Sequence, residues 1–255
     1  MKNKDKKSKS SIDNFESPDF YNLDDLLTQE HIMIRNSIRD FVKKEISPFI
    51  EDWSEKNYFP SEIVGKMGEI GIFGPTTSEK YGGGGLDYIS YGIIMQEIER
   101  EDSGMRSTAS VQSSLVMFPI EEYGSEEQKN KFLPKLASGK ILGCFGLTEP
   151  DHGSNPSGMK TKCEDKGDYY LLNGSKMWIS NSPEADIAIV WAKDENERIK
   201  GLIVERGMSG FTTPKTEGKW SLRASITGEL VFDNVKVPKS NLLPKKDGLG
   251  APLGC

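Results

Sequence analysis

Two short segments contain the side chains best suited to chemistry. They are FGLTEPDHGSN, residues 145–155, and KMWISNSP, residues 176–183. The hydroxyls of Thr148 and Ser180 can hydrogen-bond the edge of a flat heteroaromatic ligand, and Trp178 offers a ring that can lie against it. For each residue alone the competing interpretation is structural, either a Ser/Thr turn or a half-buried core tryptophan. The residue types alone leave both interpretations open, and the binding interpretation depends on the two complete segments.

A hairpin is expected to bring these two segments together. Residues 169–178 read YYLLNGSKMW, and the central Asn173-Gly174 pair is typical of a two-residue primed turn. Such a turn would place the strand that carries Trp178 beside the loop at residues 145–155.

A third candidate lies on a helix predicted from Ser103 to about Tyr123. Its polar side chains recur every three or four residues and therefore share one face. One interpretation is a solvated face on which Arg106 pairs with Asp102, four residues earlier. The other makes Arg106 a clamp for a carboxylate, because a guanidinium offers two parallel donors. The polar stripe consists of Ser103, Arg106, Ser107, Ser110, Ser113 and Ser114.

The elements that must position these residues change character near residues 138–141. Before this point, apolar residues at helical spacing predict a helix from Thr28 that Pro48 divides, and a helix capped by Ser61 with Ile63, Val64, Met67 and Ile70 buried. A helix from Tyr88 to Ile98 follows a flexible glycine loop, and a capping box at Ser125 begins the last helix. Its inner face is predicted to carry Phe132, Leu133 and Leu136.

After residue 141 the sequence is typical of strands. β-Rich runs at 187–191, 199–204 and 228–232 are separated by turn residues at 194–196 and 233–234. We therefore expect an α+β protein, in which an all-helical domain precedes an antiparallel β-sandwich or barrel. The predicted division is a flexible tail at 1–22, a helical domain at 23–140 and a β-domain at 141–255.

Composition argues against several classes of protein. The chain has 255 residues, with 39 acidic and 33 basic side chains and a net charge of −6, which offers no basic surface for nucleic acid. Three isolated cysteines and two distant histidines predict neither disulfides nor a metal site, and His31 is expected on the solvated surface. The Lys- and Ser-rich first residues resemble neither a signal peptide nor a membrane anchor. The cytoplasm is the expected compartment, or the mitochondrial matrix if the source is eukaryotic.

The two segments, and the order of helical then β-domain, resemble the acyl-CoA dehydrogenase family of flavoproteins. The similarity runs from about Leu23 to the last residue. Within the family, longer stretches are similar to the glutaryl-CoA dehydrogenase branch. These stretches are RSTASVQSSLV, LGCFGLTEP, ISNSPEADIAIVWAK, KWSLRASITG and GLGAPLGC.

The resemblance implies roles for individual residues. The segment from Phe145 through Gly153 to Ser154 would run along FAD, with Leu147 and Thr148 at the pyrimidine end of its ring. Trp178, Ile179 and Ser180 would border the same ring, and Ser154 would also approach the CoA thioester. Arg106, Ser107 and Ser110 would hold the distal carboxylate of a glutaryl group, with Glu99 close by.

The resemblance also implies a reaction. A carboxylate base would remove the α-proton of glutaryl-CoA, the β-hydride would pass to FAD, and loss of carbon dioxide would give crotonyl-CoA. An electron-transferring flavoprotein would accept the electrons, and the complete protein would be a homotetramer. Alternatives are a short-chain or non-decarboxylating acyl-CoA dehydrogenase and a non-catalytic module that binds flavin or a CoA thioester.

One departure from the family concerns catalysis. Family members continue beyond the position of Cys255 into a C-terminal helical bundle that supplies the catalytic glutamate, further flavin contacts and most of the oligomer interface. The chain is therefore expected to be an inactive fragment, and no catalytic residue is assigned within it. In addition, Asn155 stands where an aspartate is usual.

Overall fold

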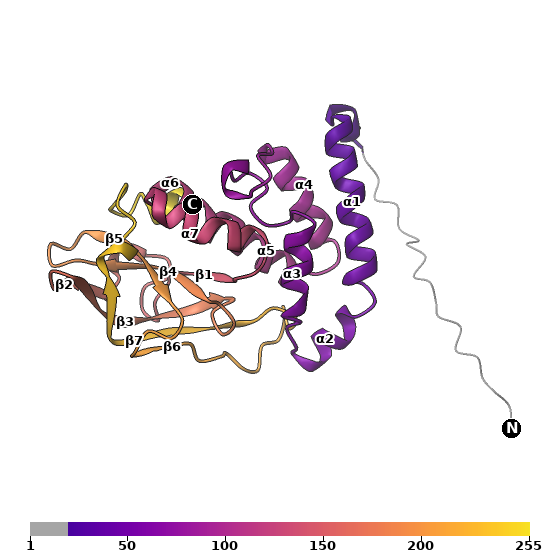
Figure 1. Ribbon diagram of the computed structural model, residues 1–255. Coiled ribbons are helices and arrows are strands. Elements are labelled where there is room, and N and C mark those ends of the chain that lie inside the picture. The colour runs from indigo at the N-terminus through magenta and orange to yellow at the C-terminus, as the bar shows by residue number, and fades with distance from the viewer. Residues whose placement is uncertain (1–19) are drawn as a thin grey trace, which may run out of the picture.

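The computed structural model describes residues 20–255, so the flexible tail predicted at 1–22 lies outside the described residues except for its last three. Helices form one part of the molecule and strands the other (Figure 1). The helices are α1 Gln29–Glu45, α2 Ile50–Lys56, α3 Glu62–Glu69, α4 Tyr88–Glu99, α5 Ser103–Ser110, α6 Phe118–Tyr123 and α7 Glu126–Ala137. The predicted break at Pro48 separates α1 from α2. The capping box predicted at Ser125 begins α7.

His31 is buried, so the prediction of a solvated surface histidine is wrong. The His31 N–H donates to Thr28 Oγ1 at 3.2 Å, and the Thr28 N–H donates to His31 Nδ1 at 3.3 Å. The other ring nitrogen lies 3.0 Å from a carboxylate oxygen of Asp87, the residue that caps α4. The ring is buried because it closes the capping box of α1 and joins two helix N-termini.

The prediction of the buried face of α3 is correct only in part. Ile63, Val64 and Met67 are buried as predicted, but Ile70 is 37% exposed because the helix ends at Glu69. The side chain of Ser61 makes no capping hydrogen bond. Residues 82–86, which belong to the loop expected to be flexible, are held by backbone hydrogen bonds to residues 74–79.

The long helix predicted from Ser103 is continuous but irregular. A π-helical segment, Val111–Met117, joins α5 to α6. The wider turn of a π-helix shifts the faces of the residues that follow it. Ser113 is consequently buried and accepts a hydrogen bond from the Gly74 N–H at 3.0 Å, so it leaves the predicted polar stripe.

The strands form one curled, seven-stranded sheet, with the order β1-β4-β2-β3-β7-β6 and β5 paired to β4. β4 runs parallel to β1 and β2, whereas the other pairs are antiparallel, so the expectation of a purely antiparallel domain is wrong. The long connection between β1 and β4 contains β2 and β3 and lets β4 return in the direction of β1. The strands are β1 Gly143–Gly146, β2 Lys162–Asp165, β3 Tyr169–Ser180, β4 Ile187–Lys193, β5 Ile199–Glu205, β6 Phe211–Thr212 and β7 Thr227–Pro238.

The hairpin predicted at Asn173-Gly174 does not form. Both residues lie inside β3, where the register with β7 shifts between Leu172 and Gly174. The predicted turn at 233–234 lies inside β7, opposite this shift, and the Asn234 N–H donates to Asn173 Oδ1 at 2.8 Å. Gly174 has φ +137°, a conformation that favours glycine because it lacks a side chain. Here the glycine forms a β-bulge instead of a turn.

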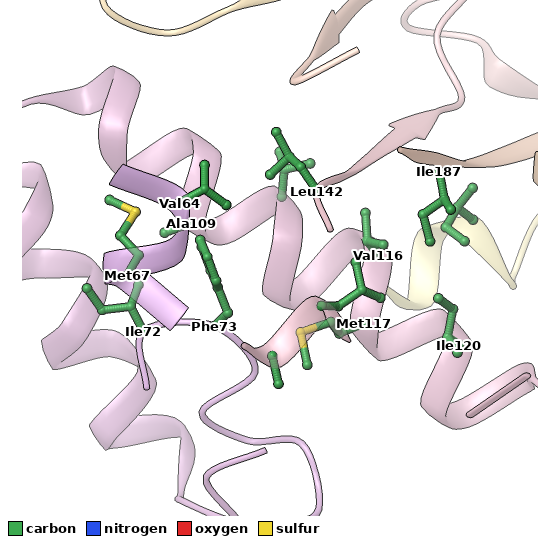
Figure 2. Packing of buried hydrophobic residues seen from close by; sticks show 14 of the residues in the cluster. Val64, Met67, Ile72, Phe73, Ala109, Val116, Met117, Ile120, Leu142 and Ile187 are labelled. Carbon is green, nitrogen blue, oxygen red and sulfur yellow. The ribbon is translucent and has the colours of Figure 1, made fainter. Parts of the chain in front are cut away.

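One hydrophobic core joins the helices to the sheet. β4 alternates strictly: Ile187, Ile189 and Trp191 belong to the core cluster shared with the helices, whereas Ala188, Val190 and Ala192 pack on the other face. Figure 2 shows Ile187 and Leu142 in the same cluster as Val116 and Met117 of the π-helical segment. The sheet therefore holds its site residues in a fixed relation to the helices.

Candidate functional site

The loop after β1 lies beside the end of β3, as the sequence predicts, but hydrogen bonds between the two segments hold it there instead of a hairpin. The Met177 N–H donates to the Thr148 carbonyl at 2.9 Å. The Lys176 ammonium donates to the Leu147 carbonyl at 3.1 Å. These bonds bring residues 145–155 and 176–183 together on one surface, which we call the wall.

Three polar groups of this wall are unpartnered, and its tryptophan is exposed. The hydroxyls of Thr148 and Ser180 and the N–H of Thr148 make no hydrogen bond within residues 20–255. The Trp178 side chain is 66% exposed, and its backbone has φ +62°, a left-handed conformation that is strained for a tryptophan. The structural interpretations, a Ser/Thr turn and a half-buried core tryptophan, therefore fail for these residues.

The remaining predicted cofactor residues divide into a buried and an exposed group. Ile179 is 3% exposed, and Phe145 packs edge-on against Trp191 with ring centroids 6.1 Å apart. Leu147 is half buried against the same core. Gly153 and Ser154 lie on an exposed loop, and the Ser154 hydroxyl makes no hydrogen bond in the described chain. The buried group supports the wall from behind, and the exposed group extends it.

A buried ion pair lies behind the wall. Lys176 Nζ lies 2.9 Å from Glu149 Oε1, and the two side chains are 0% and 4% exposed. Glu149 also accepts the N–H groups of Lys160 at 2.6 Å and Thr161 at 3.0 Å. Burial alone would raise the pKa of Glu149, but the hydrogen bonds from Lys160, Thr161 and Lys176 outweigh it and lower the pKa to about 2. Glu149 is therefore a charged, buried group whose carboxylate accepts three hydrogen bonds from the protein itself.

Arg106 pairs with Glu99 instead of Asp102. Its Nε lies 2.6 Å from Glu99 Oε2, and its Nη1 donates to Ser110 Oγ at 3.3 Å. Asp102 is engaged elsewhere, because its carboxylate accepts the Met105 N–H and caps α5. A hydrogen bond from Arg106 lowers the pKa of Glu99. The Arg106 side chain remains 35% exposed, and its guanidinium keeps free donors for an anion.

The stripe contains further hydroxyls close to this arginine. The Ser103 hydroxyl hydrogen-bonds Glu99. The Ser107 hydroxyl makes no hydrogen bond in the part of the chain that the structure describes. The structure thus groups Arg106, Ser107 and Ser110 on α5, while no hydrogen bond joins Arg106 to Thr148 or Trp178 among the described residues.

Two buried amides connect the helix of the stripe to the wall, and sequence reasoning missed both. Gln112 donates to the carbonyls of Leu136 and Ile141 and accepts the Gly143 N–H at 2.8 Å. Asn181 donates to the Gly143 carbonyl at 3.2 Å. No sequence signal separated Gln112 from the polar serines around it. The Lys176 and Glu149 pair was also missed, although both residues belong to the singled-out segments.

The described residues form no metal site, and two of their cysteine thiols are buried. Within residues 20–255, no three His, Cys, Asp or Glu side chains gather as a metal site. Cys144 and Cys163 are buried, and burial raises the pKa of each thiol to about 12, which makes them inert. No helix of the described residues is both long and apolar enough to cross a bilayer.

Comparisons with known proteins agree with this architecture. Residues 28–140 match the acyl-CoA dehydrogenase N-terminal domain, and residues 144–235 match the acyl-CoA dehydrogenase middle domain. A glutaryl-CoA dehydrogenase of Desulfococcus multivorans is 44% identical over 86% of this chain and 58% of its own length. An acyl-CoA dehydrogenase of Bacillus subtilis is 43% identical over 86% of this chain and 59% of its own.

The structure is similar to that of a glutaryl-CoA dehydrogenase from Mycobacterium smegmatis in complex with FADH2. The TM-score is 0.90 and the identity 48%, over 92% of this chain and 60% of that one. The chain thus spans about three fifths of the length of the relatives it matches. Both domain matches together cover most of the described residues. The chain therefore belongs to the acyl-CoA dehydrogenase family.

Proposed function

We propose that the complete protein is an FAD-dependent glutaryl-CoA dehydrogenase that forms crotonyl-CoA and carbon dioxide. The observation that carries the proposal is the wall on which the unpartnered hydroxyls of Thr148 and Ser180 flank the exposed Trp178. The similarity to glutaryl-CoA dehydrogenases at 44% and 48% identity supports the choice of substrate.

The wall fits a flavin. The Thr148 N–H and hydroxyl would hydrogen-bond the pyrimidine end of the ring, and the Ser180 hydroxyl would bond a ring nitrogen further along. Trp178 would cover part of the ring, with Ile179 and Phe145 supporting the wall from behind. Bound FAD supplies an acceptor for the hydride that leaves the substrate's β-carbon.

Arg106 would set substrate specificity. Its free guanidinium donors, with the hydroxyls of Ser107 and Ser110, match a carboxylate at the far end of a glutaryl group. Glu99 holds the Nε side of the guanidinium and so orients the other donors. Ser154, on its exposed loop, would contact the CoA portion of the thioester.

The reaction removes an α-proton, acidified by the thioester, and a β-hydride, after which the distal carboxylate leaves as carbon dioxide. Neither Glu149 nor Glu99 is proposed as the base, because Lys176 and two backbone N–H groups enclose the first and Arg106 neutralises the second. Holding the α-carbon away from water and the thioester oxygen near donors favours the enolate-like charge. We further propose, from the resemblance alone, a separate catalytic base, an electron-transferring flavoprotein as acceptor and a homotetramer.

Replacement of Arg106 by Gln in the complete protein tests the clamp. We expect kcat/KM for glutaryl-CoA to fall roughly 10- to 100-fold, the effect of losing a charge-assisted carboxylate contact. FAD affinity and turnover of butyryl-CoA, which has no distal carboxylate, should stay unchanged. Lys43→Gln, at an exposed position of α1, removes the same charge as a control. Undiminished glutaryl-CoA turnover in Arg106→Gln would rule out the clamp.

A non-decarboxylating acyl-CoA dehydrogenase is the second candidate. The Bacillus subtilis relative, named only as an acyl-CoA dehydrogenase, is 43% identical, close to the 44% of the glutaryl-CoA dehydrogenase relative. Labelled carbon dioxide released from glutaryl-CoA carrying the label in its distal carboxylate distinguishes the two. Flavin reduction without labelled carbon dioxide would favour the second candidate.

A further inference from the structure

We propose that the buried Lys176–Glu149 ion pair is a positioning device that orients the Leu147–Thr148 peptide toward the cofactor. The inference rests on the proposed binding of FAD to the wall. Neither residue touches the exposed side of the wall, so both act through the loop between them.

All polar contacts of the lysine go to the loop. Its Nζ lies 3.1 Å from the Leu147 carbonyl and 2.9 Å from Glu149 Oε1, with the Met159 sulfur at 4.0 Å. The side chain starts on β3, two residues before Trp178, and is fully buried. The lysine therefore ties the strand that carries Trp178 to the loop that carries Thr148.

The direction of the Leu147 carbonyl determines the direction of the Thr148 N–H. In a planar trans peptide the C=O and the following N–H point in opposite directions. Because the Leu147 carbonyl points inward to Lys176, the Thr148 N–H points away from the ion pair. That N–H has no partner among the described residues. The ion pair thus presents a free backbone donor on the wall.

The glutamate fixes the other end of the loop. Its carboxylate accepts the N–H groups of Lys160 and Thr161, which lead into β2, while its own N–H donates to the His152 carbonyl at 3.2 Å. The segment between Glu149 and Lys160 includes Gly153 and Ser154. One carboxylate therefore anchors the start and the return of the loop.

A contribution to global stability does not by itself explain why this ion pair is buried. Burying two charges costs desolvation energy, and an apolar replacement of both partners is often neutral or stabilising. A pair whose bonds all serve one loop at a binding wall is better explained by the conformation that it imposes. The two explanations predict different outcomes when the charges are removed together.

The experiment uses the complete protein, with and without FAD, and compares Lys176→Met, the double variant Lys176→Met/Glu149→Gln, and Lys193→Met. The double variant removes both charges, and its one amide oxygen keeps one of the two acceptors that Lys160 and Thr161 use, since their N–H groups bond different oxygens of Glu149. Lys193→Met is the control, because Lys193 also lies in the sheet but pairs with the exposed Glu197. The readouts are urea unfolding of the apoprotein, FAD affinity by fluorescence titration, and hydrogen exchange of the Met177 amide.

We expect Lys176→Met to lose both stability and FAD affinity. The double variant should regain part of the stability that Lys176→Met loses, because it leaves no unpaired buried charge, while its FAD dissociation constant stays raised roughly tenfold or more. Its Met177 amide, which bonds the Thr148 carbonyl, should exchange faster than in the wild type. Lys193→Met should match the wild type in FAD affinity and Met177 exchange.

Two measurements on the double variant can contradict the positioning role. A double variant with wild-type FAD affinity and wild-type protection of the Met177 amide would overturn the positioning role. If the wild type itself bound no FAD, the proposed function would fail, and the exchange of the Met177 amide in the apoprotein would still decide whether the ion pair orders the loop.

Discussion

Glu149 keeps its charge in the interior because its hydrogen bonds outweigh the effect of burial. Its pKa lies at about 2, below the ordinary value of 4.5. The unfolded chain therefore takes up a proton at this site first as the pH falls. The stabilisation that the carboxylate provides is complete above about pH 4.5 and is lost as the pH falls toward 2.

Acid unfolding should reveal this group. Between about pH 6 and pH 3, we expect the wild type to lose part of an advantage of about 3 kcal/mol over Glu149→Gln. Urea unfolding at successive pH values measures the difference in the free energy of unfolding between the two proteins. Glu217→Gln, at an exposed carboxylate, controls for the loss of one negative charge. A difference that stays constant over this range would contradict a depressed pKa for Glu149.

Single residues of the wall show what a sequence reveals about a site. The types of Thr148, Trp178 and Ser180 were compatible with an aromatic ligand, but no pattern distinguished an exposed tryptophan from a core tryptophan. That distinction depends on the exposure of Trp178 and on its φ of +62°, which arise from a register shift between β3 and β7. Likewise, the pairing of Arg106 with Asp102 was wrong, because Asp102 caps α5 and Arg106 pairs with Glu99.

At the scale of elements, local signals predicted the helices better than the sheet. The capping box at Ser125 and the break at Pro48 depend on neighbours in sequence, so both were predictable. The Asn173-Gly174 pair was misread as a turn, because the same positive φ serves a turn and a bulge. The distinction depends on Asn234, which lies 61 residues away in sequence. The parallel pairing of β4 with β1 also has no local signal.

The close packing around the bulge at Gly174 predicts the effect of adding a side chain there. A Cβ at this position would lie 2.7 Å from Thr161 Cα and 2.6 Å from Thr161 Oγ1. We therefore expect Gly174→Ala to lower the free energy of unfolding by about 2–4 kcal/mol through overpacking and backbone strain.

Gly167→Ala is the matched control for that substitution. Gly167 also has a positive φ, +83°, but a Cβ there would meet nothing within 4 Å. Its cost should stay near 1 kcal/mol, the effect of backbone conformation alone. Urea unfolding of both variants gives the comparison, and equal losses would show that contact with Thr161 does not matter.

At the scale of the molecule, the helices and the sheet act as one unit. They share a hydrophobic core, and Arg223 of the β-domain donates to the carbonyls of Ser54 and Glu55 at the end of α2. Gln112 further joins the helix of the Arg106 stripe to β1. These contacts fix the position of the proposed carboxylate clamp on the helices relative to the proposed flavin wall on the sheet.

The most direct test of the account is an anaerobic titration of the complete protein with glutaryl-CoA. The flavin absorbance and labelled carbon dioxide from the distal carboxylate are followed together. We predict that bound FAD is bleached and that crotonyl-CoA and carbon dioxide form in equal amounts, whereas Arg106→Gln binds FAD but is bleached far more slowly. Absence of bound FAD, or unchanged flavin absorbance when glutaryl-CoA is added, would contradict the account.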